Sequence, residues 1–482
     1  MQRSLPLNPV VSKTEKAFLD NRHKALELIE AFGSPLNIVF PQEVKRNFER
    51  FNNLFSELEL NGTILYAQKA NKSFALLREL TFAGSGTNNA SLFELQRALA
   101  NGCPPALAEA GGPKTEDYIN LASFSGSLVN VDSIDELHRV KRIAGKLSLK
   151  PRILLRLSGF KTKGIQILSK PTRFGIDVDS IGSALVYVKQ NEEHFTFEGL
   201  SYHLDTVAIS EKSIALNSLV RTTLDAMRMG LSVKMLDIGG GFKVNYLQDH
   251  VAWENYMTAL RESLLGKQPP LTWQGTGFGL RAENGVIRGN LNMYSYYDDL
   301  VQEDYLKELL SQHSNEAGMT FAQFFKETRI ELVLEPGRAL LAGAGITMAR
   351  VEEVSRNTLG DTFVRLDMNR ADVTIQDLEL FVDPIIISHS TGEKTEQLED
   401  GCYLIGNLCL ESDFISRRKV YLPHIPKPGD ALAFVNSAGY IMDFNSHQAA
   451  LQRIAEKVAI CTDQNNHLRW VRDEEYWPAR HN

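Results

Sequence analysis

The stretch TILYAQKANKSFALLREL, Thr63 to Leu80, contains the pattern that decides the fold. Its apolar start, TILYA, predicts a buried β-strand, and the polar QKANKS predicts a turn. The segment SFALLREL then places apolar residues at the i, i+3 and i+4 spacing of an amphipathic helix. Repetition of such strand, turn and helix units predicts a parallel sheet, because parallel strands need crossover connections.

The same unit recurs along the first two thirds of the chain. The strand candidates are Thr63–Ala67, Thr81–Gly86, Pro105–Ala110, Ser127–Val131, Arg152–Leu157, Phe197–His203, Val233–Ile238 and Glu331–Glu335. Helical patterns fall between them, such as SLFELQRAL after the second strand. Eight units predict an α/β protein built on a closed (β/α)₈ barrel of the TIM type, whose chemistry lies at the C-terminal ends of the strands.

Two further parts are expected around this barrel. The segment between Gly241 and Glu335 is far longer than the roughly 30 residues of a βα unit, which predicts an insertion at about 245–325 whose many aromatic residues serve packing. After Gly345, short β-branched and aromatic segments such as ITMARVEEV and ALAFV predict an antiparallel β domain. We expect a barrel over 38–344 and a β-sandwich or β-barrel domain from 1–37 plus 345–482, with a final helix in SHQAALQRIAEKVAI, 446–460.

The composition excludes several classes of protein. The 482 residues are 43% hydrophobic and carry 52 basic against 59 acidic side chains, a net charge of −7 without a basic cluster, which argues against nucleic acid as a partner. The four cysteines contain no CxxC pair and are too sparse for a disulfide framework, so we expect a reducing, cytoplasmic setting. The uncharged apolar stretches, such as Ala339–Ala349, are well short of the roughly 20 residues that span a bilayer, so no membrane partner is expected.

Lys69 is the first candidate for chemistry. It follows an apolar strand at the predicted active end of the barrel, where partial removal from water favours the neutral amine that attacks carbonyl groups. A Schiff-base lysine needs this setting. A surface lysine with a buried aliphatic stem is an equally open interpretation of Lys69 alone.

Two later motifs supply binding groups. LDIGGGF, 236–242, frees the backbone to bring several N–H groups close to a phosphate, although a glycine run is often only a tight turn. LEPGRALLAG, 334–343, offers the Arg338 guanidinium to an anion and the Glu335 carboxylate to a positive partner such as a protonated pyridine nitrogen. With His203 as a flat ring that could stack, these parts are the ones needed to hold pyridoxal 5′-phosphate.

At these motifs the chain resembles the fold-type III pyridoxal-phosphate decarboxylases, the group of diaminopimelate, ornithine and arginine decarboxylases. YAQKAN, NNASLFEL, LLRL, SYHLDT, GGGF, EPGR, GNLCLESD and SAGYIMDFN match in the family's order between about 36 and 444. The resemblance implies that Lys69 binds the cofactor covalently, that His203 stacks on it and that Glu335 holds its ring nitrogen. It further implies cofactor contacts for Asn88, Arg156, Thr206, Gly239, Gly240, Gly241, Gly337, Arg338 and Tyr440. Asn88 stands where the family often has aspartate, and Asp205 replaces a usual glycine.

The resemblance also implies a homodimer with shared active sites. Cys409 matches the family's cysteine that reaches the partner's site, and substrate contacts are implied for Glu411, Asp413 and Tyr440. Leu410 stands where relatives place an acidic residue that binds the distal amine of the substrate. The stretch that binds a distal carboxylate in diaminopimelate decarboxylases is also absent from this sequence. These departures lead us to expect a bulkier or less polar amino acid, or an amino-acid conjugate, as substrate.

The hypothesis is therefore decarboxylation of an amino acid at its α carbon, with Lys69, His203 and Cys409 as the catalytic groups and no metal ion. An ordinary cysteine is mostly a thiol at neutral pH, so Cys409 could return a proton to the α carbon. The alternative is that Cys409 is a small buried apolar residue. A racemase of the same fold is the second interpretation, disfavoured because such enzymes face the ring nitrogen with arginine. An inactive decarboxylase-like regulator is the third.

Overall fold

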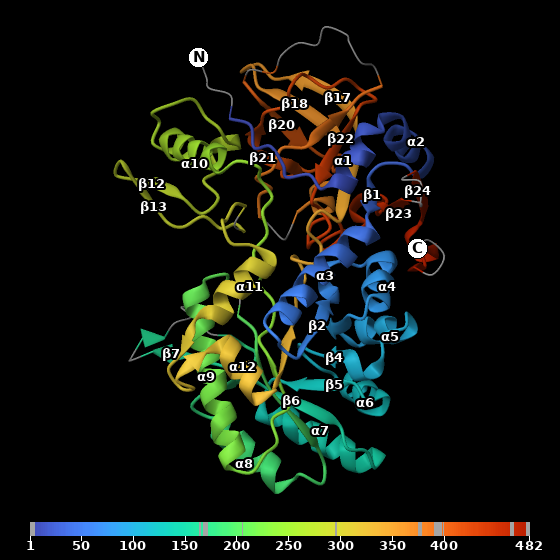
Figure 1. The fold of residues 1–482 in the computed structure, drawn as a ribbon. Coiled ribbons are helices and arrows are strands. Elements are labelled where there is room, and N and C mark those ends of the chain that lie inside the picture. The colour runs from blue at the N-terminus through green and yellow to red at the C-terminus, as the bar shows by residue number, and fades with distance from the viewer. Residues whose placement is uncertain are drawn as a thin grey trace.

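The computed structural model describes residues 5–162, 165–166, 172–204, 206–294, 296–374, 378–389, 398, 400–462 and 467–478. The chain forms a barrel and a second, sheet-based domain that lies above the barrel in the view of Figure 1. No helix within these ranges combines the length and the apolar character needed to cross a lipid bilayer.

Eight parallel strands close the barrel. In spatial order they pair β2–β3–β4–β5–β6–β10–β11–β16 and return to β2, which confirms the predicted (β/α)₈ class. Their bounds are β2 Gly62–Ala67, β3 Gly86–Asn89, β4 Ala108–Ala110, β5 Leu128–Val131, β6 Arg152–Ser158, β10 Thr196–Tyr202, β11 Met235–Asp237 and β16 Glu331–Leu334. A short strand β9, Ile176–Asp177, adds to the end of β6.

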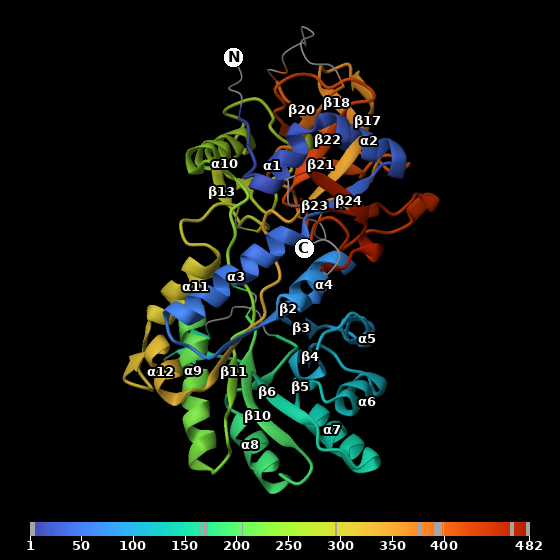
Figure 2. The ribbon, with the colours of Figure 1, turned by 45° about the vertical axis from the view of Figure 1, so that its right-hand side comes forward.

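Helices cover the outside of the barrel, and Figure 2 shows α5, α6 and α7 beside strands β4 to β6. The helices of this layer are α3 Pro41–Glu57, α4 Phe74–Phe82, α5 Leu92–Ala100, α6 Glu116–Ser125, α7 Ile134–Leu147, α8 Ile181–Gln190, α9 Ile209–Arg228, α11 Gln302–Ser311 and α12 Phe321–Thr328.

Four of these helices begin at a hydroxyl side chain that follows a barrel strand. Ser73, Ser91, Thr115 and Ser133 accept the backbone N–H of the third residue after them, at 3.1, 3.2, 3.3 and 3.1 Å. Each cap ends the turn and starts the helix, so the active end of the barrel is built from short, defined connections.

Two local predictions are wrong. Thr81–Gly86 is not a strand: Thr81 and Phe82 complete the last turn of α4, and the chain turns at Gly84 before β3 starts at Gly86. Residues 446–460 do not form a helix either. They hold a short 3₁₀ turn, Ala449–Leu451, and the start of β23, Glu456–Thr462, whose Val458 and Ile460 are buried in the second core. Tertiary pairing with β1 overrides the helical spacing there.

The second sheet is mostly antiparallel, with two parallel pairings, β1 with β23 and β18 with β20. Its strands are β1 Leu36–Val39, β17 Gly345–Arg356, β18 Thr362–Leu366, β19 Ile385–Ile387, β20 Cys402–Ile405, β21 Phe414–Val420, β22 Ala431–Val435, β23 and β24 Leu468–Arg472. Helices α1, Lys13–Asp20, and α2, Arg22–Phe32, share a core with β1, β17, β22 and β23.

The long segment after β11 packs against the second domain. It contains α10, His250–Leu264, and the hairpin of β12, Arg281–Glu283, with β13, Val286–Arg288. Trp273 stacks on Phe414 of β21 at 5.0 Å, and Phe278 contacts Phe381 at 5.1 Å. The aromatic side chains of this segment therefore join the two domains, and the proposed division at 37/38 and 344/345 stays a prediction.

Candidate active site

Lys69 lies immediately after β2, in the 3₁₀ turn Gln68–Ala70. The turn is held by the late tyrosine segment, since the Tyr440 N–H donates to the Ala70 carbonyl at 2.9 Å and the Asn71 amide donates to the Ala438 carbonyl at 2.7 Å. The Lys69 side chain is exposed, so the expected partial burial is wrong in this structure. It faces two cavities, of about 790 and 540 Å³, that share Lys69, His203, Leu204, Thr206 and Glu335 in their walls.

Glu335, at the end of β16, belongs to a buried cluster of three carboxyl groups. One of its oxygens lies 3.3 Å from His203 Nδ1, and the other accepts from Asn88 Nδ2 at 2.6 Å. Asn88 also donates to Glu109 at 3.0 Å, and Asp237 is the third member. Oxygens of all three carboxyl groups lie within 4.8 Å of one another.

The three carboxyl groups differ in protonation. Burial alone would raise the pKa of Glu335, but its hydrogen bond with His203 and the nearby positive charges outweigh burial and lower the pKa to about 2. Burial, reinforced by the charge of Glu335, raises the pKa of Glu109 to about 8 and raises that of Asp237 well above its ordinary value. Of the three, Glu335 is therefore the carboxyl group that holds a negative charge most readily, and it faces the cavities.

Glycines form the neighbouring wall. The Gly239–Gly241 turn follows β11, and a Cβ on Gly240 would press against the carbonyl oxygen of Glu335. A Cβ on Gly337 would lie 2.7 Å from the Tyr440 hydroxyl. Among the described residues no acceptor pairs with the N–H groups of Gly241 and Phe242, which line the smaller cavity and so remain available to an anion.

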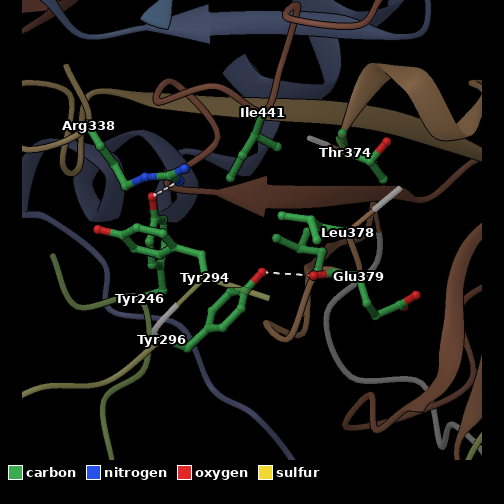
Figure 3. A pocket seen from close by; sticks show the side chains of 10 residues that line it. Tyr246, Tyr294, Tyr296, Arg338, Thr374, Leu378, Glu379 and Ile441 are labelled. Carbon is green, nitrogen blue, oxygen red and sulfur yellow. Dashed lines mark hydrogen bonds between the residues drawn. The ribbon is translucent and has the colours of Figure 1, made fainter. Parts of the chain in front are cut away.

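Arg338 adds a cation to this wall, and Figure 3 shows how aromatic side chains hold it. Its guanidinium donates to the Tyr246 hydroxyl at 2.7 Å and lies 4.0 Å from the centre of the Tyr294 ring. Within the described ranges no carboxylate forms an ion pair with Arg338. Tyr246 and Tyr294 come from the long segment after β11, so this segment also positions a site residue.

Thr206 and Tyr440 complete the smaller cavity. Thr206 lies just before α9, where its hydroxyl accepts the Ala208 N–H at 3.1 Å. Asp205 lies outside the described residues. The far wall of the larger cavity contains Arg156, which pairs with Asp132 at 3.1 Å and lies 5.1 Å from the Phe174 ring.

Three predicted residues lie elsewhere. Cys409 and Glu411 are exposed on the loop between β20 and β21, and Asp413 is buried at its end. The Asp413 carboxylate accepts the N–H groups of Leu408 at 2.8 Å and Arg370 at 2.9 Å, so it fixes the loop. None of these three residues lines the two cavities. The alternative of a buried structural Cys409 is wrong.

The groups around the cavities fit pyridoxal phosphate. Within the described residues, two N–H groups without an acceptor and a guanidinium without a carboxylate partner suit a phosphate. The buried Glu335 carboxylate suits a cationic ring nitrogen, and the exposed Lys69 amine suits an aldehyde. The family described as "Pyridoxal-dependent decarboxylase, pyridoxal binding domain" matches residues 41–286. The chain belongs to the pyridoxal-dependent decarboxylase family.

Curated relatives and solved structures match nearly the whole chain. An uncharacterized protein of Sinorhizobium fredii is 30% identical over 92% of this chain and 91% of its own length. The diaminopimelate decarboxylase of Aquifex aeolicus is 24% identical over 93% of this chain and 91% of its own. The crystal structure of diaminopimelate decarboxylase from M. jannaschii with L-lysine has a TM-score of 0.71 at 20% identity, covering 95% of both chains.

The protein is thus a pyridoxal-phosphate-dependent amino-acid decarboxylase. Sequence reasoning missed several residues of its site. Glu109 could have been noticed as an acid within an apolar strand segment, PALAEA, whereas nothing in the pattern of α9 marks Lys212, which lies behind the glycine turn.

Proposed function

We propose that this decarboxylase removes the α-carboxylate of a bulky or weakly polar amino acid, or of an amino-acid conjugate. The observation that carries the proposal is the buried Glu335 carboxylate, which lines the same two cavities as the Lys69 amine and lies beside the wall formed by the glycines and Arg338. Opposed amine, acid and anion-binding groups are what a phosphorylated pyridine aldehyde requires of its protein.

Each group has a distinct task in this proposal. When bound, the cofactor supplies an electron sink for the bond electrons that the leaving carboxylate gives up. Lys69 attaches the cofactor, Glu335 keeps a proton on its ring nitrogen and His203 lies against its ring. Asn88 holds Glu335 in place through the hydrogen bond of 2.6 Å.

The phosphate is assigned to the wall formed by the glycines and Arg338. Gly239, Gly240, Gly241 and Gly337 leave room for close approach, and Thr206 and Tyr440 offer hydroxyl groups. Arg156 in the far wall is assigned to the substrate side of the cofactor, with Tyr440 as a second substrate contact.

We further propose that the enzyme works as a homodimer. Cys409 and Glu411 are exposed and do not line their own chain's cavities, so in this proposal they act in the cavity of a second subunit. There the Cys409 thiol returns a proton to the α carbon, and Asp413 holds the loop that presents it. Leu410, 60% exposed beside Cys409, offers no charge to a distal amine, which supports a substrate without one.

Carbon dioxide release across D- and L-amino acids and their conjugates, with chiral analysis of the remaining amino acid, tests the reaction. We expect gas release from apolar or conjugated substrates, and a Lys69→Ala variant as the inactive control. Racemisation without gas, or release from lysine and ornithine alone, would contradict the proposal.

Mixing two variants that each lack one catalytic group tests the shared site. Lys69→Ala and Cys409→Ala chains, dissociated and reassociated, should regain up to about a quarter of wild-type activity, because about half of the dimers are mixed and each mixed dimer contains one intact site of two. A monomer in solution, or a mixture without activity, would contradict the shared site.

A further inference from the structure

A buried lysine lies behind the glycine turn of the active site. Lys212 belongs to the first turn of α9, and its side chain is 1% exposed. Its ammonium donates a hydrogen bond to the Gly240 carbonyl, and the rings of Phe242 and Tyr305 lie 5.2 and 5.8 Å from it. Within the described part of the chain no carboxylate forms an ion pair with Lys212.

This placement is unfavourable for an ammonium without an anion nearby. Burial lowers the pKa of Lys212 to about 7, and the charge of Glu335 opposes that shift only in part. A negative group on the other side of the turn would stabilise the charged form, because Coulomb attraction is stronger where water is excluded.

The hydrogen bond also fixes the direction of one peptide unit. The Gly240–Gly241 bond is trans, so its carbonyl and its N–H point to opposite sides of the peptide plane. Because Lys212 holds the Gly240 carbonyl on its own side, the Gly241 N–H points away from α9. This N–H is one of the two that have no acceptor among the described residues, and Gly241 lines the smaller cavity.

We propose that Lys212 is a positioning residue for the cofactor phosphate: it orients the Gly241 N–H toward the phosphate and places a positive charge behind the glycine turn. The inference rests on the proposed phosphate position at the glycines and Arg338. It adds a second cation to that position, one that touches the backbone rather than the ligand.

Cofactor affinity with and without the phosphate separates this role from a purely structural one. The equilibrium affinities of the apoenzyme for pyridoxal phosphate and for pyridoxal are measured in wild type, Lys212→Met and Lys212→Gln. We expect Lys212→Met to weaken the binding of pyridoxal phosphate by about tenfold, the size of one charge-assisted hydrogen bond. The affinity for pyridoxal should not change. Lys212→Gln keeps a donor without the charge, so we expect a smaller loss with the same selectivity. It also provides the test if Lys212→Met fails to fold.

Two further variants make the outcomes distinct. Lys234→Met removes a lysine at the opposite end of β11, 56% exposed, and should change neither affinity. Arg338→Met should weaken the binding of pyridoxal phosphate but not that of pyridoxal. If Arg338→Met is selective and the Lys212 variants are not, the inference is wrong while the phosphate position stands. If neither is selective, the proposed phosphate position is wrong, and the inference fails with it.

Discussion

Replacing Glu335 by glutamine should slow decarboxylation by roughly 10²–10³-fold without disturbing the fold. Glutamine has the shape of glutamate, its amide oxygen can still accept from Asn88, and its amide nitrogen can donate to His203 Nδ1. Those contacts measure 2.6 and 3.3 Å in the wild-type protein. The substitution therefore removes mainly the negative charge.

The size of the effect follows from the burial of that charge. Two unit charges about 4 Å apart attract by roughly 4 kcal/mol at an effective dielectric constant of about 20. This is close to a thousandfold in rate, since each factor of ten corresponds to about 1.4 kcal/mol. We expect somewhat less, because part of the attraction also stabilises the bound ground state.

Glu109→Gln is the matched control. It changes a carboxyl group in the same cluster, bonded to the same Asn88 amide, but one whose pKa is raised to about 8 by burial and by the charge of Glu335. At pH 7 it is already neutral, so glutamine should change the rate by less than about threefold. The kcat and KM of carbon dioxide release are measured at pH 7 with saturating cofactor. A kcat near that of the wild type in Glu335→Gln, or an equal loss of kcat in Glu109→Gln, would contradict the proposed role of the Glu335 charge.

Three further predictions concern the same cluster and turn. Asn88→Asp places a further carboxyl group against Glu109 and Glu335 and should lower the free energy of unfolding by roughly 1–3 kcal/mol. The melting temperature should fall, and Glu109→Gln in the same chain should restore it. An unchanged melting temperature would argue against this packing. Gly240→Ala should abolish cofactor binding, whereas Gly182→Ala in α8, which has open space around it, should not; equal cofactor binding in both variants would contradict the tight turn. The raised pKa of Glu109 means that the folded protein keeps a proton that the unfolded chain loses above about pH 4.5, so this group stabilises the fold less as pH rises toward 8. The melting temperature of Glu109→Gln relative to that of the wild type should therefore be higher at pH 8 than at pH 5. A difference that does not depend on pH would be evidence against a raised pKa of Glu109.

The barrel was predictable because its signals are local. Apolar strands followed by turns and amphipathic helices recur along the chain, and the parallel closure follows from that order. The motifs around Lys69, Glu335 and Arg338 were predictable for a similar reason, since each follows a strand at the end of the barrel where chemistry gathers.

What the sequence did not reveal depends on contacts between distant segments. Nothing local marks 456–462 as a strand, because its pairing with β1 comes from the other end of the chain. The same is true of Glu109, whose raised pKa depends on its burial and on Glu335, and of Lys212, whose role depends on the turn after β11. Protonation and buried charge are properties of the assembled cluster, and a single segment does not carry them.

The lysine that binds the cofactor can be identified directly. The protein loaded with pyridoxal phosphate is reduced with borohydride, digested and mapped by mass spectrometry, with Lys69→Ala as the control. We expect the pyridoxyl mass on Lys69 in the wild type and no specific attachment in the variant. Attachment at another lysine, such as Lys72 or Lys212, would contradict the assignment of Lys69 as the lysine that binds the cofactor.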